Sequence, residues 1–561
     1  MLRTQEQERR EHDGDEASER SDWWRDAVIY QVYPRSFSDA NGDGIGDLAG
    51  VAARLGHIRD LGVDAVWLSP FYVSPQADAG YDVADYCDVD PAFGTLADFD
   101  ALLHAVHGAG MRLIVDLVPN HTSSEHPWFR AALDAPSGSR ERRRYIVRRG
   151  RGTSGELPPN DWTSVFGGPA WSPIGAEGEW YLHLFDAGQP DLDWTNPDVV
   201  AEFDRILRFW LDRGVDGFRV DVAHGLIKAD GLPDWGRESG EIIDGGARGP
   251  MWDQEGVHEI YRRWRRVVAE YGPDRILVAE AWVAPAERLS RYVRPDEMHQ
   301  AFNFDFLTVG WSAERMRRSI ATALRENDRV GATTTWVLSN HDVVRVATRL
   351  GLADTDSWPP SAQPGEVPDD ALGRRRARAA ALVMLALPGS AYVYAGEELG
   401  LPDHLTLPDA ARQDPTFRRT GGAESGRDGC RVPLPWEAAA PAFGFSATGA
   451  SWLPQPEAFR ELAANRQAAD PDSTLALYRR CIALRRELGL GSGEVEWPAR
   501  DGVAEDGSAE GVLAFRNRGV RVTANLGDRP HRVGEWPNTV ASSPDAVRDG
   551  YLQPGGAVWQ W

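Results

Sequence analysis

The sequence LIVDLVP (residues 113–119) decides the fold class, because it is a short, mostly aliphatic run followed by turn-forming residues. Such runs, rich in β-branched residues, are typical of buried strands in a parallel sheet. Seven further runs of this kind alternate along the chain with longer segments of helical periodicity. The eight predicted strands span residues 27–33, 65–70, 113–119, 217–223, 276–282, 300–306, 333–340 and 390–396. Eight such units predict an α/β fold of the (β/α)8 type, a TIM barrel.

The third and fourth predicted strands are unusually far apart. They begin 104 residues from each other, whereas the two preceding steps are 38 and 48 residues long. The intervening segment is rich in Gly, Pro and Trp, as in SVFGGPAW (164–171). We therefore expect residues 120–188 to form a loop-rich domain inserted after strand 3, at the end of the barrel where loops build the active site.

The two ends of the chain differ from the barrel in composition. The first residues are charged and polar with almost nothing apolar to bury, which predicts disorder. Beyond the helical pattern TLALYRRCIALRREL (474–488), runs such as GVLAFRN (511–517) alternate apolar and polar residues and predict antiparallel strands. The predicted organisation is a disordered arm (1–21), a barrel (22–119 and 189–490), an inserted domain (120–188) and a C-terminal β domain (491–561).

The composition limits the kind of partner. Of 561 residues, 42% are hydrophobic and 10% aromatic, which is typical of a globular protein with a large core. There are 61 Lys and Arg against 85 Asp and Glu, and the formal net charge of −24 disfavours nucleic acid and anionic membranes as partners. No apolar run reaches the ~20 residues that a transmembrane helix needs. We expect neither nucleic acid nor membrane as a partner.

The cysteines indicate a reducing compartment. Cys87, Cys430 and Cys481 are an odd number, widely spaced, without a CxxC pair that would suggest zinc or a disulfide framework. The polar N-terminal residues lack the apolar stretch of a secretory signal. These features predict a cytoplasmic protein.

Three acids follow predicted barrel strands. Asp221 ends GFRVD, Glu280 ends ILVAE, and Asp342 follows WVLSNH. Any one of them alone is readily explained as a structural, salt-bridged carboxylate, but three at one barrel mouth repel one another and shift one another's pKa values. Two carboxyl groups that flank a glycosidic bond can hydrolyse it, one as nucleophile and the other as proton donor, so the pattern indicates carboxylate chemistry.

Seven short motifs extend this pattern. They are GYDVADY (80–86), DLVPNH (116–121), QPDLDW (189–194), GFRVD (217–221), VAEAW (278–282), SNHD (339–342) and YAGEELG (394–400). In this order, over about residues 22–561, the chain resembles glycoside hydrolase family 13, the α-amylase clan, and within it the α-glucosidase and oligo-1,6-glucosidase branch. The resemblance implies that Asp221 is the nucleophile, Glu280 the general acid/base and Asp342 the transition-state stabiliser, with retention of configuration.

The resemblance also implies residues that bind the sugar. Arg219, two positions before the nucleophile and on the same strand face, would hold Asp221 ionised and oriented. His121 and His341 would donate hydrogen bonds to sugar hydroxyls, and Tyr81 would stack beneath the sugar ring.

In this branch a carboxylate paired with an arginine closes the pocket of an exo-acting enzyme. Asp82 and Arg431 are the matching candidates here. Arg431 lies in GRDGCRVPLPW (426–436), which differs from the RTPMQW form commoner in oligo-1,6-glucosidases. Phe166 and Phe185 are expected to form the aromatic wall of the pocket, with core packing of the inserted segment as the alternative.

The stretch DANGDGIGDLAG (39–50) spaces oxygen donors like a calcium loop. Position 12 of this loop is Gly50 instead of Glu, so it is not an EF-hand. Similar family members carry a structural calcium or magnesium ion there, and the alternative is an Asx-rich turn closed by its own hydrogen bonds. We expect no organic cofactor. The predicted metal ligands are Asp39, Asn41, Asp43, Asp47 and the carbonyl of Ile45.

The resulting functional hypothesis is an exo-acting, retaining α-glucosidase that hydrolyses terminal α-linked glucose from maltose- or isomaltose-type oligosaccharides, with some transglucosylation. The alternative is an α-glucosyltransferase or isomerase acting on sucrose, maltose or trehalose. A catalytically inactive transport-protein subunit would have lost one of the three acids, and all three are present. Val222 accompanies α-1,6 activity in similar enzymes, but the following Ala223-His224-Gly225 departs from their pattern, so both linkages stay open.

Overall fold

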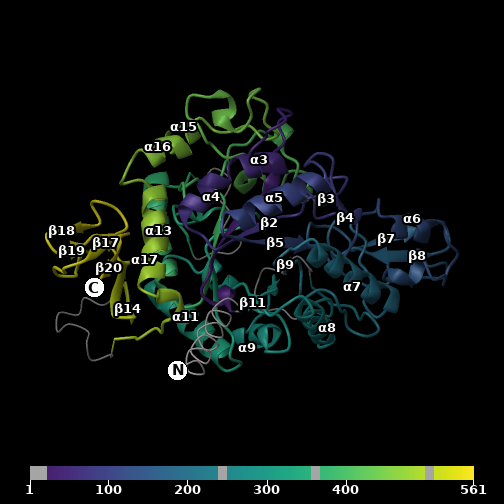
Figure 1. The fold of residues 1–561 in the computed structure, drawn as a ribbon. Helices are drawn as coiled ribbons and strands as arrows, with labels where there is room; N and C mark the ends of the chain where they lie inside the picture. The colour runs from purple at the N-terminus through teal and green to yellow at the C-terminus, as the bar shows by residue number, and fades with distance from the viewer. Residues whose placement is uncertain (1–21, 238–248, 356–366, 499–510) are drawn as a thin grey trace, which may run out of the picture.

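The computed structural model describes residues 22–237, 249–355, 367–498 and 511–561 (Figure 1). The predicted disordered arm, 1–21, lies outside these ranges. Among the residues described, no helix combines the length and apolarity needed to cross a lipid bilayer.

Eight parallel strands form one sheet that curls into a nearly closed barrel. Neighbouring strands follow one another in chain order, and β13 returns to pair with β1. Between β11 and β12 the barrel is closed by a single bridge from Phe302 to Thr335. The barrel strands are β1 (Val28–Val32), β2 (Ala65–Leu68), β5 (Arg112–Leu117), β9 (Gly217–Val220), β10 (Ile276–Ala279), β11 (Gln300–Ala301), β12 (Thr335–Val337) and β13 (Ser390–Tyr394). The predicted (β/α)8 barrel is confirmed.

All eight predicted strands are present, but the observed strands end earlier. The difference is largest at 300–306, where β11 ends at Ala301 and α10 (Phe304–Thr308) begins soon after. The side chain of Asn303 accepts a hydrogen bond from the amide of Phe306 and so caps α10. One short polar side chain in an aromatic run therefore ends the strand.

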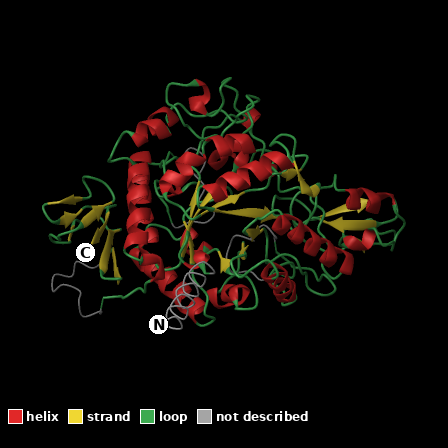
Figure 2. Ribbon diagram, viewed as in Figure 1, coloured by secondary structure: helices red, strands yellow, loops and turns green. Residues whose placement is uncertain are grey.

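Helices surround the sheet (Figure 2). In α7 (Pro197–Asp212), Asn196 caps the first turn, Pro197 occupies the first position, and apolar residues at helical spacing form one buried face. The helix predicted at 474–488 is α17 (Thr474–Glu487), capped by Ser473. The other long helices are α5 (Leu96–Gly108), α8 (Val257–Ala269), α11 (Ala313–Asp328) and α13 (Asp370–Ala386). The short ones are α2 (Pro34–Phe37), α3 (Leu48–Ala53), α4 (Leu55–Leu61), α6 (Pro127–Asp134), α9 (Ala286–Leu289), α12 (Val346–Arg349), α14 (Pro415–Arg419), α15 (Phe459–Leu462) and α16 (Ala464–Ala468).

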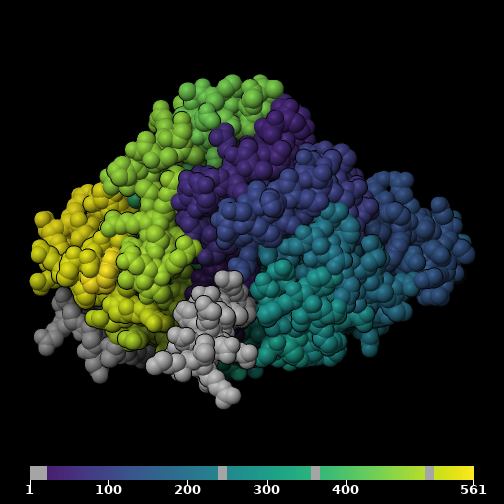
Figure 3. Space-filling model, in the orientation of Figure 1, coloured from purple at the N-terminus to yellow at the C-terminus, as the bar shows by residue number. Residues whose placement is uncertain are grey.

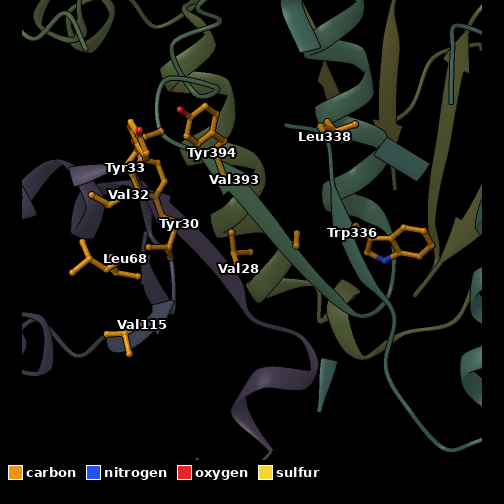
Figure 4. Close-up of a cluster of buried hydrophobic side chains, with 14 of the residues drawn as sticks. Val28, Tyr30, Val32, Tyr33, Leu68, Val115, Trp336, Leu338, Val393 and Tyr394 are labelled. Carbon is orange, nitrogen blue, oxygen red and sulfur yellow. The ribbon is translucent and has the colours of Figure 1, made fainter. Parts of the chain in front are cut away.

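Alternate strand residues face two different cores. Val28, Tyr30 and Val32 pack in the large cluster that includes the helices (Figure 4), whereas Ile29 between them belongs to the cluster inside the barrel. Because successive side chains of a strand point to opposite faces, this parity extends to the strand ends. In β9, Phe218 and Val220 belong to the large cluster, so residues 219 and 221 point into the barrel.

The inserted segment carries a small sheet of its own. Its strands β6 (Val147–Arg149), β7 (Trp171–Ile174) and β8 (Glu179–Leu182) are antiparallel, in the order β6-β8-β7. A loop-rich segment was predicted, and strands of three or four residues give no periodic signal. A second excursion, the antiparallel pair β3 (Tyr72–Val73) and β4 (Asp85–Val89), follows β2.

The C-terminal residues form two antiparallel sheets, as predicted. The larger sheet packs on α13, where the indole of Trp559 donates to the carbonyl of Leu382 at 2.9 Å. Figure 3 shows the inserted segment and the C-terminal strands at opposite ends of the molecule. The two sheets comprise β14 (Val512–Asn517), β15 (Val520–Asn525), β20 (Ala557–Gln560) and β17 (Thr539–Ala541), and β16 (His531–Arg532), β19 (Tyr551–Leu552) and β18 (Val547–Arg548).

Candidate active site

The C-terminal ends of three adjacent barrel strands bring charged side chains together. Asp116 lies in β5, Arg219 in β9, Asp221 directly after β9 and Glu280 directly after β10. The strand register places Arg219 beside Asp116 on one neighbouring strand. All four side chains are buried. Because alternate residues of each strand face inward, one arginine and three acids lie together in the buried interior at this end of the barrel.

Arg219 is the centre of this cluster. Its Nη1 donates to Asp221 at 2.6 Å and to Asp116 at 2.8 Å, and its Nη2 lies 3.6 Å from Glu280. Its guanidinium also faces the ring of Trp67, 5.1 Å from the centroid. Charges this deeply buried interact more strongly than they do in water. This is the geometry that the predicted role of Arg219 requires.

The protonation of Asp221 and Glu280 follows from their surroundings. Burial raises the pKa of both carboxyl groups, more strongly that of Asp221, and the charge of Arg219 opposes the rise. Two adjacent buried carboxyl groups titrate as a pair and retain one proton more readily than isolated ones. Because Arg219 donates directly to Asp221 but only approaches Glu280, we place the shared proton on Glu280 and the charge on Asp221.

The backbone of Val222 decides which oxygen of Glu280 carries that proton. The Val222 amide donates to Oε2 of Glu280 at 2.6 Å, so the proton lies on Oε1. Val222 adopts a positive φ of 45°, a conformation that is strained for a β-branched residue. Strain of this kind persists where the surrounding structure enforces it, often at active sites.

Asp342 follows β12 and faces two arginines. Its Oδ1 accepts hydrogen bonds from Arg431 at 2.9 Å and from Arg427 at 3.1 Å, and its Oδ2 lies 3.2 Å from Nε2 of His341. Burial alone would raise the pKa of Asp342, but His341 and the arginines together lower it well below its usual range. Asp342 is thus a fixed negative charge.

The predicted pairing of Asp82 with Arg431 is wrong. The carboxylate of Asp82 is buried and accepts hydrogen bonds from the Ser74 hydroxyl and from the amides of residues 77 and 78. Asp82 therefore stabilises the loop in which it lies. Backbone amides of a tight turn donate to this carboxylate locally. Among the hydrogen bonds described for Asp82, none comes from an arginine.

A different carboxylate–arginine pair lies beside Asp342. Oδ1 of Asp78 accepts a hydrogen bond from Nη2 of Arg427 at 2.6 Å, and Nη1 of the same arginine reaches Asp342. Arg431 contacts Asp342 and the carbonyl of His341 instead. The carboxylate–arginine pair beside Asp342 is therefore Asp78 with Arg427.

Tyr81 and the two histidines form stacked and hydrogen-bonded contacts beside the acids. The Tyr81 ring stacks on His341 with centroids 5.1 Å apart and planes 8° from parallel, and its hydroxyl donates to Asp116 at 3.0 Å. His121 lies with Nε2 3.1 Å from the carbonyl of Tyr81. Burial lowers the pKa of His121 to about 4, so its ring is neutral at pH 7.

Phe166 and Phe185 lie where the inserted segment meets the barrel. Their rings pack edge to face at 5.6 Å. Phe166 faces the guanidinium of Arg427 at 4.9 Å, and Phe185 lies 5.1 Å from the ring of His121. Both also belong to the apolar cluster of the inserted segment. The two interpretations, pocket wall and core packing, therefore apply to the same residues.

Comparison with known proteins decides the family. Residues 31–490 match the family described as the α-amylase catalytic domain, which is more than half of the chain. The chain belongs to the α-amylase family. Within this family it is 39% identical over 531 residues to a probable α-glucosidase of Rhizobium meliloti (strain 1021), with 90% of each chain covered. It is 36% identical over 501 residues to an oligo-1,6-glucosidase of Parageobacillus thermoglucosidasius, covering 83% of this chain and 84% of that one.

A solved structure of the α-amylase family fold matches over nearly the whole chain. The α-glucosyl transfer enzyme XgtA superposes with a TM-score of 0.80 at 34% sequence identity, covering 96% of this chain and 99% of that one. As a member of the family the chain is a glycoside hydrolase. Its site supplies what retaining hydrolysis uses: an ionised carboxylate, a protonated carboxyl group and a further negative charge.

The predicted metal loop at 39–50 is held by its own side chains. Asp39, Asn41, Asp43 and Asp47 each accept hydrogen bonds from backbone amides of this loop, among them the amide of Ile45. In the part of the chain that the structure describes, no three His, Cys, Asp or Glu side chains are grouped as metal ligands. These hydrogen bonds are the ones that the alternative, an Asx-rich turn, would form. The side-chain oxygens of the loop are also of the kind that Ca²⁺ prefers as ligands.

Three residues of the site were not among the predicted ones. Asp116 did carry a signal, because it lies two residues from Ile114 of the inner core and so shares its inward direction. Asp78 and Arg427 carried none, since both lie in loops, 349 residues apart. Only the folded chain brings these two together.

Proposed function

We propose that this chain is an exo-acting, retaining α-glucosidase that releases glucose from the non-reducing end of short α-glucosides. The observation that carries the proposal is the cluster of Asp221 and Glu280 around Arg219, next to Asp342. The Asp78–Arg427 pair supports a pocket closed at one end, as exo-action requires. The relatives named α-glucosidase and oligo-1,6-glucosidase support the substrate class.

In the first step, the ionised Asp221 attacks the anomeric carbon of the terminal glucose. The glycosidic bond breaks as Oε1 of Glu280 gives its proton to the departing oxygen. The fixed charge of Asp342 stabilises the positive charge that develops on the sugar. The product is a glucosyl ester of Asp221 and a shortened sugar with its new hydroxyl group.

In the second step, Glu280, now ionised, takes a proton from a water molecule. The resulting hydroxyl attacks the anomeric carbon, and the ester bond to Asp221 breaks. Two inversions at the same carbon restore its configuration. The enzyme returns to its starting state with a proton on Glu280 and a charge on Asp221.

A second candidate is α-glucosyl transfer, which the likeness to XgtA favours. Both reactions share the glucosyl ester. They differ in whether water or a sugar hydroxyl gives its proton to Glu280, so some transfer is expected when acceptor sugar is abundant.

The first test is the initial rate of glucose release from maltose and from isomaltose at equal concentration. Asp221→Asn serves as the blank, because the amide is nearly isosteric but not nucleophilic. Release from either sugar, absent in the variant, supports the proposal, and the faster sugar assigns the linkage. Transfer is scored in the same assay as trisaccharide formed. A wild-type chain that cleaves neither sugar nor any aryl α-glucoside contradicts the proposal.

We also propose that the loop at 39–50 binds a structural Ca²⁺ or Mg²⁺ ion. Each carboxylate oxygen has two lone pairs, so a hydrogen bond from an amide leaves an acceptor position on it. Excess chelator is expected to lower the melting temperature of wild type, and added Ca²⁺ to restore it. Asp43→Ala removes an exposed oxygen ligand of the ion, so chelator should lower the melting temperature of this variant less than that of wild type. A wild-type melting temperature unchanged by chelator would count against the site.

We further propose that the protein works in the cytoplasm. The support is its three free cysteines, of which Cys430 and Cys481 are buried. Fractionation of cells that produce the full chain tests this, and recovery of the activity outside the cytoplasmic fraction contradicts it.

A further inference from the structure

Asp414, in the loop before α14, is a buried acid without a part in the mechanism above. Its side chain is fully buried, and its Oδ2 accepts a hydrogen bond from Nε of Arg427 at 2.6 Å. The same oxygen lies 3.9 Å from Nη1 of Arg431. Asp414 is therefore the common counter-charge of the two arginines that face Asp342.

The contact at Nε determines how the guanidinium of Arg427 is oriented. Nε is the atom at which the planar group joins its side chain, and a bond there fixes the rotation of the plane. The two Nη groups then point to Asp78 at 2.6 Å and to Asp342 at 3.1 Å. One face of the plane also lies on the ring of Phe166.

The position of Asp414 is itself fixed from behind. Asp428 accepts hydrogen bonds from the amides of Gln413 and Asp414, at 2.7 and 3.0 Å. Gly426 approaches Asp414 so closely that a Cβ there would lie 2.7 Å from its carboxyl carbon. The loop thus holds this carboxylate in one place behind Arg427.

We infer that Asp414 is a positioning residue for substrate binding, which orients Arg427 and balances the charge of the Arg427–Arg431 pair. This inference rests on the proposed function. Asp414 does not touch the sugar itself and acts through Arg427. Without it, two adjacent cations would share Asp78 and Asp342, and the guanidinium plane would be free to turn.

The test is Asp414→Asn, because this change separates charge from structure. Oδ1 of Asp414 caps α14 by accepting from the amide of Thr416 at 2.8 Å, and asparagine caps a helix as well as aspartate does. The amide group cannot serve as an anionic acceptor for Nε of Arg427. Asp409→Asn is the matched control, since Asp409 lies in the same loop and is 85% exposed.

The expected result is a rise of about 10- to 100-fold in KM for an aryl α-glucoside and in the inhibition constant of glucose, the effect of losing one charge-assisted hydrogen bond. We expect kcat and the melting temperature to change little, and Asp409→Asn to behave like wild type. In an Arg427→Gln background, Asp414→Asn should add no further rise, because the two residues act as one unit.

A KM and a glucose inhibition constant like those of wild type would overturn the role of Asp414. An undiminished effect in the Arg427→Gln background would do the same. If Asp414→Asn does not fold, Asp414→Ser removes the charge and keeps a side chain that can cap α14, and a wild-type KM in that variant also overturns the inference. A wild-type chain inactive on every α-glucoside would instead overturn the proposed function.

Discussion

At the scale of single residues, the site depends on an asymmetry between two buried carboxyl groups. Asp221 accepts a direct hydrogen bond from Arg219, whereas Glu280 receives a backbone amide on one oxygen only. The strained backbone of Val222 supplies that amide. Burial raises the pKa of both acids, and on the basis of these two contacts we place the charge on Asp221 and the proton on Glu280.

The first prediction concerns Glu280→Gln. General acid catalysis contributes about 10²–10⁴-fold, so cleavage of maltose-type sugars should fall by that amount. An aryl α-glucoside with a good leaving group needs little protonation and should still form the glucosyl ester. Its breakdown needs the base, so we expect a burst of one phenol per enzyme followed by slow turnover, measured by stopped-flow absorbance.

Glu314→Gln is the control for this prediction, because Glu314 is exposed on α11. It should match wild type on both substrates. Equal losses on the disaccharide and the aryl glucoside, without a burst, would contradict the acid/base role of Glu280.

At the scale of elements, the ends of the barrel strands carry buried acids outside the site as well. Glu397 follows β13 and accepts a hydrogen bond from the hydroxyl of Tyr478 in α17 at 2.8 Å. Burial, with the neighbouring charge of Glu398, raises the pKa of Glu397 to about 8. At pH 7 this carboxyl group is therefore mostly protonated and joins the last strand to the last helix of the barrel as a neutral group.

The second prediction follows from the sign of this shift. The unfolded chain loses the Glu397 proton near its ordinary pKa of about 4.3, whereas the folded chain keeps it up to about pH 8. Its contribution to stability is therefore full below that ordinary value and is lost as pH rises through about 8. Glu397→Gln resembles the protonated form and should lose less melting temperature than wild type between pH 5 and pH 9.

Thermal melts across this pH range test the second prediction. Glu487→Gln, an exposed change on α17, is the control and should follow the wild-type profile. Parallel profiles for wild type and Glu397→Gln would show that Glu397 is ionised in the folded protein and would refute the prediction.

At the scale of the whole molecule, the C-terminal sheets are joined to the barrel by buried and polar contacts. Trp559 is fully buried and bonds to α13 through its indole. Arg378 of α13 donates to the carbonyl of Ser542 at 2.5 Å, and Arg375 pairs with Asp545 at 3.0 Å. With such contacts, the sheets and the barrel should unfold together.

The third prediction tests this coupling with Trp559→Ala. Removing a buried tryptophan costs about 3–5 kcal/mol, so the melting temperature should fall while the protein still melts in one calorimetric transition. Activity at 25 °C should stay near that of wild type, because Trp559 belongs to the C-terminal sheet and packs on α13, outside the strand ends that carry the acids. Tyr551→Ala, at a side chain 44% exposed in β19, is the control and should melt like wild type.

Two separate transitions in Trp559→Ala, with the barrel transition unmoved, would show that the C-terminal sheets are an independent unit. The same experiment on wild type sets the reference. Loss of activity without loss of stability would contradict the separation of this sheet from the site.

The sequence by itself determined the barrel, the strand that carries each acid and the family. Strand periodicity is a local property, and Asp221 and Glu280 directly follow their strands, so their inward direction is settled by parity within a few residues. The same parity places Arg219 and Asp116. The sequence analysis did not predict the short strands β6 to β8 or the end of β11. The three strands contain too few residues to show a periodic pattern, and the end of β11 depends on a single helix cap.

Only the tertiary structure decided which loops meet at the site. Asp78 lies just before the motif GYDVADY (80–86), which contains Asp82, and Arg427 and Arg431 lie in one motif (426–436), so either acid could have met either arginine. Backbone amides of a tight turn donate to Asp82, whereas Asp78 accepts a hydrogen bond from Arg427. Asp414, from a third segment, orients that arginine. Contacts between distant loops depend on how the whole chain packs, and no local pattern encodes them.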